Sequence, residues 1–510
     1  PNALFFYEAQ RDGPNVIPSV MDRQPSHLTD EQASIYSTPT YKNDVLQGNL
    51  NKIGGPINVA SGWFDAGDYL KFVQTASYTD AIMLFAVRQY PSLLNGGPAD
   101  FKSEGKYGLD WLQKMWDDTH RILYYQVGIG DGNGKTILGD HDFWRLPQAD
   151  DQMHVKPGDP AYYVKYRPVF EAGPAGSLIS PNLAGRLAAD FGLCYQLYHN
   201  SNPNYANSCL LSGEHIFDLA KTSNVGQLLT TAPHDYYPET EWRDDMELGA
   251  TELYFATALG HLPSGLSHSN AMYYLQQAAH WANAYMHSPN DGTDSLNLYD
   301  VSGLAHYELF SALTQAGNPG NLEVTKSALL NDLRAQLVNG TTQARKDPFG
   351  FGIAYGGGDA TPHALGYALE ASFYDQMAGV STYNTFGLMQ RNWVLGNNAW
   401  GSSFIVGAGS TFPDCMQHQV ANLSGSRDGT PPIVLGATVD GPSAMSNFQG
   451  LGGLQTGMRR CPPGGGDPFK VFSGKGARYV DNVIDWPSVE PADDYTALGI
   501  LVFAQQVTSS

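Results

Sequence analysis

Two aspartates three residues apart stand among aromatic residues in the segment SGWFDAGDYLKF, residues 61–72. Gly67 between Asp65 and Asp68 permits a tight turn ahead of a helix that we expect to begin near Tyr78, and in such a turn both carboxylates can face one cavity. An ionised aspartate can hold a water molecule and accept its proton, while the second orients the same water. The alternative is that both carboxylates only bind backbone amides of the turn.

A glutamate near the other end of the chain offers the complementary chemistry. Glu490 lies between Val489 and Pro491, close after Trp486 and just before a helix that begins near 493–495. Partly apolar surroundings and the neighbouring acidic residues at 493 and 494 favour a carboxyl group that keeps its proton, as a general acid must. The alternative is an ordinary loop glutamate that precedes a helix.

The composition indicates a large folded protein with a neutral partner. The chain has 510 residues, 42% hydrophobic and 15% charged, so a sizeable core is available. Its formal net charge of −21 argues against a nucleic acid, whose phosphates require Lys and Arg. No run of about 18 apolar residues appears, so no membrane span is expected. Aromatic residues make up 12%, which suits a groove that stacks sugar rings.

The four cysteines allow two disulfides. None forms a CxxC pair, which makes a zinc site improbable. We expect Cys194 and Cys209 to be bridged, because they fall on neighbouring predicted helices joined by a short polar loop. For Cys415 and Cys461 the sequence leaves both a bridge and free buried thiols open.

Apolar residues recur at three- and four-residue spacing in about twelve segments. We expect helices over 3–10, 78–90, 105–118, 182–198, 205–222, 245–259, 270–286, 301–316, 322–337, 363–378, 382–396 and 494–507. Ser180 before Pro181, and Ser77 or Thr79, are the expected helix caps. Few strands are convincing. Twelve helices suit six hairpins in a ring, an all-α (α/α)6 barrel, and no period of 34–45 residues favours a superhelical array.

The connections between these helices are uneven in length. Long ones run over 12–60, 121–178, 397–443 and 444–490 and are rich in Gly, Pro, Asp and aromatic residues. Loops this long are usually functional or disordered, and their Trp, Tyr and His content favours ordered, substrate-binding loops. No Pro/Ser-type linker appears, so we expect one catalytic domain over 1–510.

Ordered sequence blocks give the chain a resemblance to a known family. The segment DAGD with its aromatic flank resembles that of the glycoside hydrolase family 9 cellulases. Further blocks follow in family order: FFYEAQRDGP (5–14), LYYQVGIGDG (123–132), HDFWRLP (141–147), RDDMELGATELYFAT (243–257), NWVLGNN (392–398), SSFIVGAGSTFP (402–413) and YVDN…VE (479–490).

The resemblance implies an (α/α)6 barrel that hydrolyses β-1,4-glucan with inversion. Carried over by position, Asp68 would be the general base, Asp65 its helper on the water and Glu490 the general acid. It further implies a secreted, monomeric endo-β-1,4-glucanase that acts on β-glucan or cello-oligosaccharide without an organic cofactor. The alternatives are an exo-acting relative, which long loops over one end of the groove could create, and a non-catalytic carbohydrate-binding barrel.

The resemblance also implies candidate sugar contacts, with two departures from the family pattern. His141, Trp144, Tyr355 and His418 are the candidates, since flat rings stack on glucose and imidazoles bind hydroxyls; core packing is the alternative for each. In PDCMQHQVANL (413–423), glutamines at 417 and 419 replace the usual neighbours of His418. The segment 441–475 is longer and richer in glycine than the family pattern.

A structural calcium ion is the last implied feature. By resemblance its ligands would be Thr240, Glu241, Asp244, Asp245 and Asp300, whose oxygens suit a hard cation. The alternative is an acidic helix N-terminus that the helix dipole favours without metal.

Overall fold

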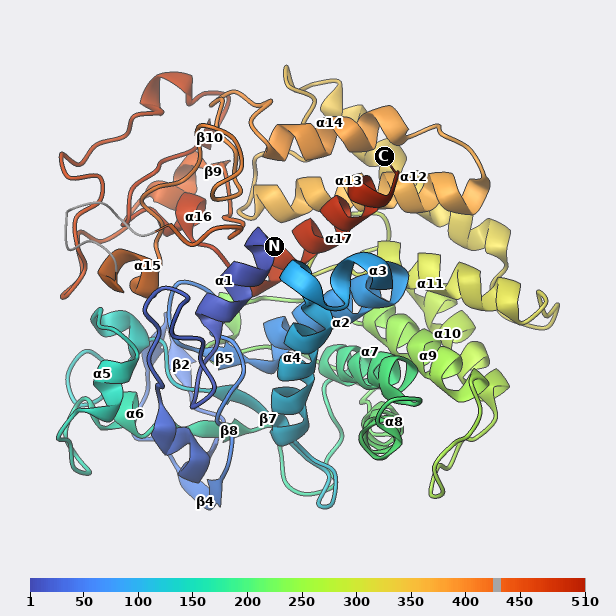
Figure 1. The fold of residues 1–510 in the computed structure, drawn as a ribbon, viewed down its shortest axis with the longest axis horizontal. Coiled ribbons are helices and arrows are strands. Elements are labelled where there is room, and N and C mark those ends of the chain that lie inside the picture. The colour runs from blue at the N-terminus through green and yellow to red at the C-terminus, as the bar shows by residue number, and fades with distance from the viewer. Residues whose placement is uncertain (425–432, 510) are drawn as a thin grey trace.

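Six helices form a closed inner ring in the computed structural model, which describes residues 1–424 and 433–509 (Figure 1). Each inner helix contacts the next, and the last contacts the first. In chain order they are α2 (Val73–Gln89), α7 (Pro181–Tyr198), α9 (Arg243–Ala258), α11 (Ser302–Gln315), α13 (Ala360–Ala378) and α17 (Asp493–Ser509).

Six further helices pack against the outside of this ring. They are α1 (Asn2–Gln10), α4 (Phe101–Met115), α8 (Pro203–Asp218), α10 (Ala271–Tyr285), α12 (Lys326–Ala344) and α14 (Asn384–Val394). The predicted (α/α)6 barrel of twelve helices is therefore confirmed, and each of the twelve helical segments expected from periodicity overlaps one of these helices. Among the described residues, no helix is long and apolar enough to cross a membrane.

The connections carry short helices and strands. The short helices are α3 (Pro91–Leu94), α5 (Gln148–Asp151), α6 (Tyr162–Lys165), α15 (Gln419–Ser424) and α16 (Trp486–Val489). The strands are β1 (Ala33–Ser37), β2 (Tyr41–Lys42), β3 (Val45–Leu46), β4 (Lys52–Ile57), β5 (Lys71–Phe72), β6 (Trp116–Asp117), β7 (Ile122–Val127), β8 (Val169–Glu171), β9 (Ser443–Ala444) and β10 (Ala477–Arg478). Of the long loop 397–443, residues 425–432 lie outside the described part of the chain.

A mixed sheet that the sequence did not predict joins the first two long connections. Its order is β4-β1-β8-β7-β5, with β6 paired to β7. β1 pairs antiparallel with β4 and parallel with β8, while β7 pairs antiparallel with both β8 and β5. Because β5 leads directly into α2, the sheet fixes the turn that precedes this inner helix.

The start of α2 differs from the prediction. The helix begins at Val73, so Ser77 and Thr79 lie inside it and do not cap it. The hydroxyl of Ser77 donates to the carbonyl of Val73 four residues earlier (2.6 Å), which satisfies it within the helix. Ser180 does precede α7 with Pro181 at the first turn, but its side chain makes no capping bond to that helix.

The predicted Cys194–Cys209 disulfide is present, and so is the Cys415–Cys461 disulfide that the sequence left open. Cys194 on α7 is bonded to Cys209 on α8, with a Cα–Cα distance of 6.2 Å. Cys415 is bonded to Cys461, at 5.2 Å, and so joins the segment before α15 to the glycine-rich loop. No described cysteine is free.

Glycines allow α7 and α9 to cross at very short distance. A Cβ atom on Gly185 would lie 2.3 Å from the carbonyl carbon of Asp245, and one on Gly249 would lie 2.5 Å from the carbonyl oxygen of Gly185. Real Cβ atoms do not approach backbone atoms so closely, so a side chain at either position must push the two inner helices apart.

We predict that Gly185→Ala lowers the midpoint of thermal unfolding, because overpacking this crossing should cost about 1–3 kcal/mol or more. Gly320→Ala is the matched control: a Cβ there meets no atom within 4 Å, so its midpoint should be unchanged or slightly raised. Differential scanning calorimetry of the two variants measures the effect. Equal midpoints would contradict the tight α7–α9 contact.

Candidate active site

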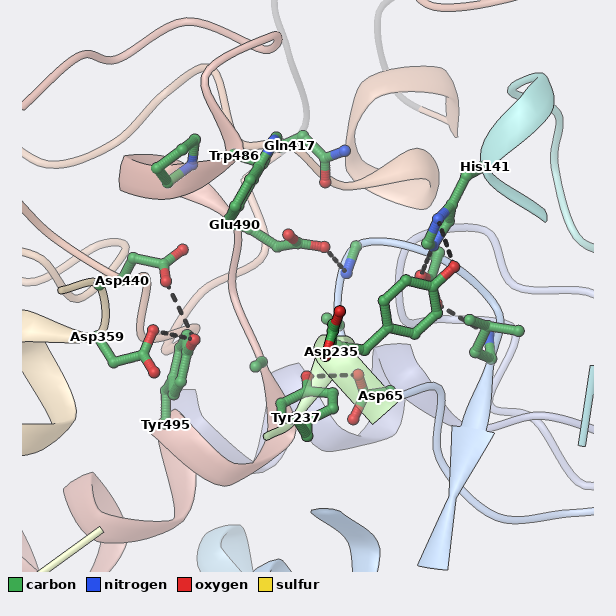
Figure 2. A pocket seen from close by; sticks show the side chains of 18 of the residues that line it. Asp65, His141, Asp235, Tyr237, Asp359, Gln417, Asp440, Trp486, Glu490 and Tyr495 are labelled. Atoms are coloured by element: carbon green, nitrogen blue, oxygen red, sulfur yellow. Dashed lines mark hydrogen bonds and ion pairs between the residues drawn. The ribbon is translucent and has the colours of Figure 1, made fainter. Parts of the chain in front are cut away.

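A cavity of about 840 Å³ opens where the inner helices begin. Its walls come from the segments just before α2, α9, α11, α13 and α17, and they include Asp65 and Asp68, Tyr237, Tyr299, Asp359 and Glu490. Because inner helices of a ring of hairpins run the same way, the loops before them gather at one end. Residues far apart in sequence therefore meet in this cavity (Figure 2).

The turn 65–68 is fixed by close backbone contact. The backbone N–H of Asp65 donates to the carbonyl of Leu70 (2.9 Å), and that of Gln419 donates to the carbonyl of Gly67 (2.7 Å). A Cβ on Gly67 would lie 2.1 Å from the carbonyl oxygen of Gln417, so only glycine fits here. The aromatic neighbours Trp63 and Tyr69 are buried and pack beneath the turn.

Charged residues behind the turn hold it in place. The carboxylate of Asp140 accepts the backbone N–H of Tyr69 (2.6 Å). Arg145 forms ion pairs with both Asp140 and Asp150, the latter at 2.7 Å. The residue next to Asp68 is thus tied to a buried ion-pair network, which limits how far the Asp68 carboxylate can move.

Asp65 is a buried carboxyl group with two hydroxyl donors. The hydroxyl groups of Thr75 and Tyr237 both donate to it, the latter at 2.6 Å. Burial, followed by the charge of Asp68, raises the pKa of Asp65 to about 7. Its backbone carbonyl accepts the N–H of Asp493 (2.9 Å), which links the turn to the start of α17.

Asp68 is paired with the predicted sugar contact His141. Nε2 of His141 lies 2.6 Å from Oδ2 of Asp68, and Nδ1 lies 3.4 Å from Oδ2 of Asp131. Burial alone would lower the pKa of His141, but its hydrogen bonds with Asp131 and Asp68 raise the pKa well above the ordinary value. The imidazole is therefore cationic near neutral pH and lies directly beside the carboxyl group of Asp68.

Glu490 faces the same turn from the other end of the chain. Its Oε1 accepts the backbone N–H of Gly67 at 3.2 Å. Burial, followed by the charge of Asp68, raises the pKa of Glu490 to about 8, so the group holds its proton at neutral pH. The sequence pointed to partly apolar surroundings together with Asp493 and Asp494. Burial is the largest cause, whereas the largest contribution from a charged group comes from Asp68 across the cavity.

The other three predicted sugar contacts have different surroundings. Trp144 lines the cavity and packs against the Cys415–Cys461 bridge and Val483. Tyr355 is not among the cavity-lining residues of the described chain, because its ring stacks on Phe351 with centroids 5.0 Å apart.

His418 also turns away from the cavity. Its Nε2 lies 2.8 Å from Oε1 of Gln10 on α1, and its Nδ1 accepts the N–H of Ala421. Burial, followed by the charge of Arg23, lowers the pKa of His418 to about 3, so the ring is neutral. Neither Tyr355 nor His418 is among the cavity-lining residues of the described chain, so both stay predictions as sugar contacts. The flanking Gln417 and Gln419, which looked like departures, line the cavity instead.

Sequence reasoning missed several cavity residues. Tyr237, Tyr299, Asp359, Asp440 and Tyr495 all line the cavity. A positional signal was available for four of them, since each lies within a few residues of the start of an inner helix. Asp440 carries no such signal, because it sits in the long loop before β9.

The predicted calcium ligands contact other groups of the protein. Asp245 is paired with the guanidinium of Arg186 (2.7 Å). Glu241 accepts the backbone N–H groups of the next two residues, and Asp300 accepts the N–H of Ser302 and the hydroxyl of Tyr285 (2.8 Å).

Asp244 accepts the N–H of Val301 (2.6 Å), and the Thr240 side chain is exposed. Asp244 and Asp245 each keep one buried oxygen without a donor. Across the described residues, no group of three or more His, Cys, Asp or Glu side chains could hold a metal ion. Arg186 supplies positive charge beside α9, and the calcium ion stays a prediction.

Comparison with known proteins gives consistent matches in sequence. The chain is 25% identical over 468 residues to an endoglucanase of Dictyostelium discoideum, covering 88% of this chain and 56% of that protein. It is 22% identical over 489 residues to endoglucanase 2 of Oryza sativa subsp. japonica, covering 88% and 67%. The chain thus spans a little over half of the first relative and about two thirds of the second.

Solved structures share the fold. The cellulase Cel9M of C. cellulolyticum superposes with a TM-score of 0.69 at 19% identity, over 100% of this chain and 97% of that one. The endoglucanase of the termite Nasutitermes takasagoensis gives 0.69 at 21% identity, over 100% and 97%. The model of the family Glycosyl hydrolase family 9 matches residues 1–503. The resemblance noted in the sequence is confirmed, and the chain belongs to glycosyl hydrolase family 9.

Proposed function

We propose that the protein hydrolyses β-1,4-glucosidic bonds of cellulose or a related β-glucan, with endo action and inversion at the anomeric carbon. The observation that carries the proposal is the pairing of a protonated Glu490 with the turn of Asp65 and Asp68 in one cavity. Family membership and the names of the endoglucanase relatives support it.

In this mechanism Asp68 is the general base and Glu490 the general acid. Asp68 accepts a proton from a water molecule whose oxygen forms the new bond to the anomeric carbon. Glu490 gives its proton to the glycosidic oxygen as the old bond to that oxygen breaks. The electron pair of the broken bond stays on the leaving oxygen, which departs as a neutral hydroxyl group. Neither step requires an organic cofactor.

The remaining contacts position these groups. His141 fixes the orientation of the Asp68 carboxyl group through the 2.6 Å contact. Asp65, held by Tyr237 and Thr75, is placed to orient the attacking water. Inverting enzymes separate acid and base by about 6.5–9.5 Å so that the water fits between base and sugar.

The surroundings of the site support a sugar polymer as substrate. Trp144 and the half-exposed Trp486 offer flat apolar surfaces, and Gln417 and Gln419 offer amide groups for hydroxyls. Cel9M, which shares the fold, has been solved in complex with cellobiose. We further propose that the protein is secreted, since its two disulfides are typical of oxidising compartments. We also propose that it acts as a monomer with a single catalytic domain.

The first products test the reaction. On a soluble β-1,4-glucan we expect viscosity to fall well before reducing ends accumulate, because endo action cuts within the chain. Proton NMR in the first minutes should detect the α anomer at the new reducing end. A β anomer would require a covalent intermediate and would overturn the roles of Asp68 and Glu490. Reducing ends that appear without loss of viscosity would indicate exo action.

The role of Glu490 predicts a dependence on the leaving group. Glu490→Gln should slow hydrolysis of the glucan by about 10² to 10⁴-fold, because the amide cannot supply the proton. On an aryl cellobioside with a dinitrophenol leaving group the loss should be much smaller, because that group departs without protonation. Equal losses on the two substrates would exclude Glu490 as the acid.

The same two substrates separate the pH profiles of the wild-type enzyme. With the glucan, kcat/KM should fall as pH rises through about 8, since Glu490 then loses the proton it must donate. With the dinitrophenyl substrate this alkaline decline should be absent. If kcat/KM declined in the same way at alkaline pH for both substrates, the group that loses its proton would not be Glu490.

The two aspartates should be unequal. Asp68→Asn removes the base, so kcat should fall by about 10² to 10⁴-fold or more. Asp65→Asn keeps an oxygen that can accept from Tyr237 and should retain measurably more of the rate. Both variants should keep the wild-type thermal midpoint, which calorimetry checks alongside kcat. A larger loss for Asp65→Asn would exchange the two roles.

A further inference from the structure

The cavity carries far more negative charge than the proposed chemistry uses. Besides the three proposed catalytic carboxyls, it is lined by Asp44, Asp131, Asp235, Asp359 and Asp440. No lysine or arginine is among its lining residues in the described part of the chain, and its one basic ring, His141, is already held between two carboxylates. A neutral glucan does not require this surplus.

Two of the additional carboxyls converge on a single hydroxyl group. The hydroxyl of Tyr495 lies 2.7 Å from Oδ1 of Asp359 and 3.0 Å from Oδ1 of Asp440 (Figure 2). One tyrosine O–H can donate only one hydrogen, so it cannot satisfy both carboxylates at once. The Asp440 residue lines the cavity and is only 5% exposed, so its carboxyl group has little contact with bulk water.

These carboxyls are fixed beside the proposed acid. The backbone N–H of Asp440 donates to the carbonyl of Glu490 (3.2 Å), and the carbonyl of Asp440 accepts the N–H of Thr361 (2.9 Å). Asp359 stands at the N-cap position of α13, yet its side chain does not cap that helix. Its carboxylate contacts Tyr495 instead of the backbone N–H groups in the first turn of α13, which an N-cap carboxylate normally accepts.

No lysine or arginine of the described residues lines the cavity beside this pair. Burial, followed by the charges of Asp359 and Glu490, raises the pKa of Asp440 well above its ordinary value. A ligand that brings a positive charge beside the pair would favour the ionised form of Asp440 and offset its repulsion with Asp359. A sugar hydroxyl brings one donor hydrogen and no charge, whereas an ammonium group brings three donor hydrogens and a full positive charge.

We propose that Asp359 and Asp440 bind the protonated amino group of a 2-amino-2-deoxy sugar unit next to the scissile bond. The enzyme then favours β-1,4-linked glucosamine oligosaccharides over the corresponding glucans. This inference rests on the proposed function, because the hydrolytic step is unchanged: water adds across the glycosidic bond and the amino group takes no part. It replaces the neutral substrate by a cationic one of the same linkage.

Binding to Glu490→Gln tests the inference without turnover. Calorimetric titrations would compare three disaccharides of the same linkage: cellobiose, the glucosamine disaccharide at a pH where its amines are protonated, and its neutral N-acetylated form. The glucosamine disaccharide should bind roughly 10- to 100-fold more tightly than the other two. Asp440→Asn in the same background should remove this preference, and Asp359→Asn should reduce it.

Two controls separate specific recognition from general charge or misfolding. Asp22→Asn removes one exposed carboxylate that does not line the cavity, so it should keep the preference. Asparagine at 359 tolerates the left-handed backbone there (φ 56°), so that variant should fold even if Asp440→Asn does not. Equal affinity for cellobiose and the glucosamine disaccharide, or a preference that survives both Asp359→Asn and Asp440→Asn, would overturn the inference.

Turnover by the wild-type enzyme distinguishes this inference from the proposed function. Faster hydrolysis of glucosamine oligosaccharides than of cello-oligosaccharides, measured as kcat/KM, supports both. Hydrolysis of cello-oligosaccharides with no gain on the glucosamine series refutes the inference and leaves the proposed function standing. Hydrolysis of neither series refutes both.

Discussion

The site depends on closure of the inner ring where α17 meets α2. The hydrogen bond between Gly67 and Glu490 joins residues 423 positions apart, and it exists only because the last inner helix packs beside the first. Further bonds cross the same seam: the N–H of Asp493 donates to Asp65, and the hydroxyl of Tyr7 on α1 donates to the carbonyl of Asp493 (2.6 Å). The proposed acid and base come from opposite ends of the chain, so their alignment depends on closure of the whole ring.

Charge is separated across this end of the barrel. The buried cations lie behind the cavity wall, each with its own carboxylates: Lys71 with Asp12 and Asp30, Arg145 with Asp140 and Asp150, Arg186 with Glu239 and Asp245. These pairs hold the turn 65–68 and the start of α9 without placing a positive side chain in the cavity. The cavity carboxyls therefore interact mainly with one another, and burial together with Asp68 keeps Glu490 protonated.

The sequence predicted those features that a single short segment encodes, and it missed those that depend on contacts between distant segments. The twelve helices follow from apolar periodicity, which each segment carries by itself. The proposed roles of Glu490, Asp65 and Asp68 came from the family resemblance, which short motifs carry. The sheet was missed because its strands are two to six residues long and pair across distant loops. The tertiary partners of His418 and Asp245 could not be predicted from local sequence: Gln10 contacts the imidazole, and Arg186, from a different helix, pairs with Asp245.

The direction of the inner helices explains why carboxyl groups can gather at this end. Five inner helices begin at the cavity wall, so their positive dipole ends face residues such as Asp359, just before α13, and Glu490, just before α17. Each helix end contributes about 0.3–1 kcal/mol in favour of a negative charge. One pKa unit corresponds to about 1.4 kcal/mol, whereas burial and Asp68 move the pKa of Glu490 from 4.5 to about 8. The helix dipoles therefore lower the free-energy cost of placing several carboxyl groups at this end of the barrel. They are too weak to remove the proton from Glu490. Glu490, the proposed general acid, therefore keeps its proton, although the helix ends beside it favour negative charge.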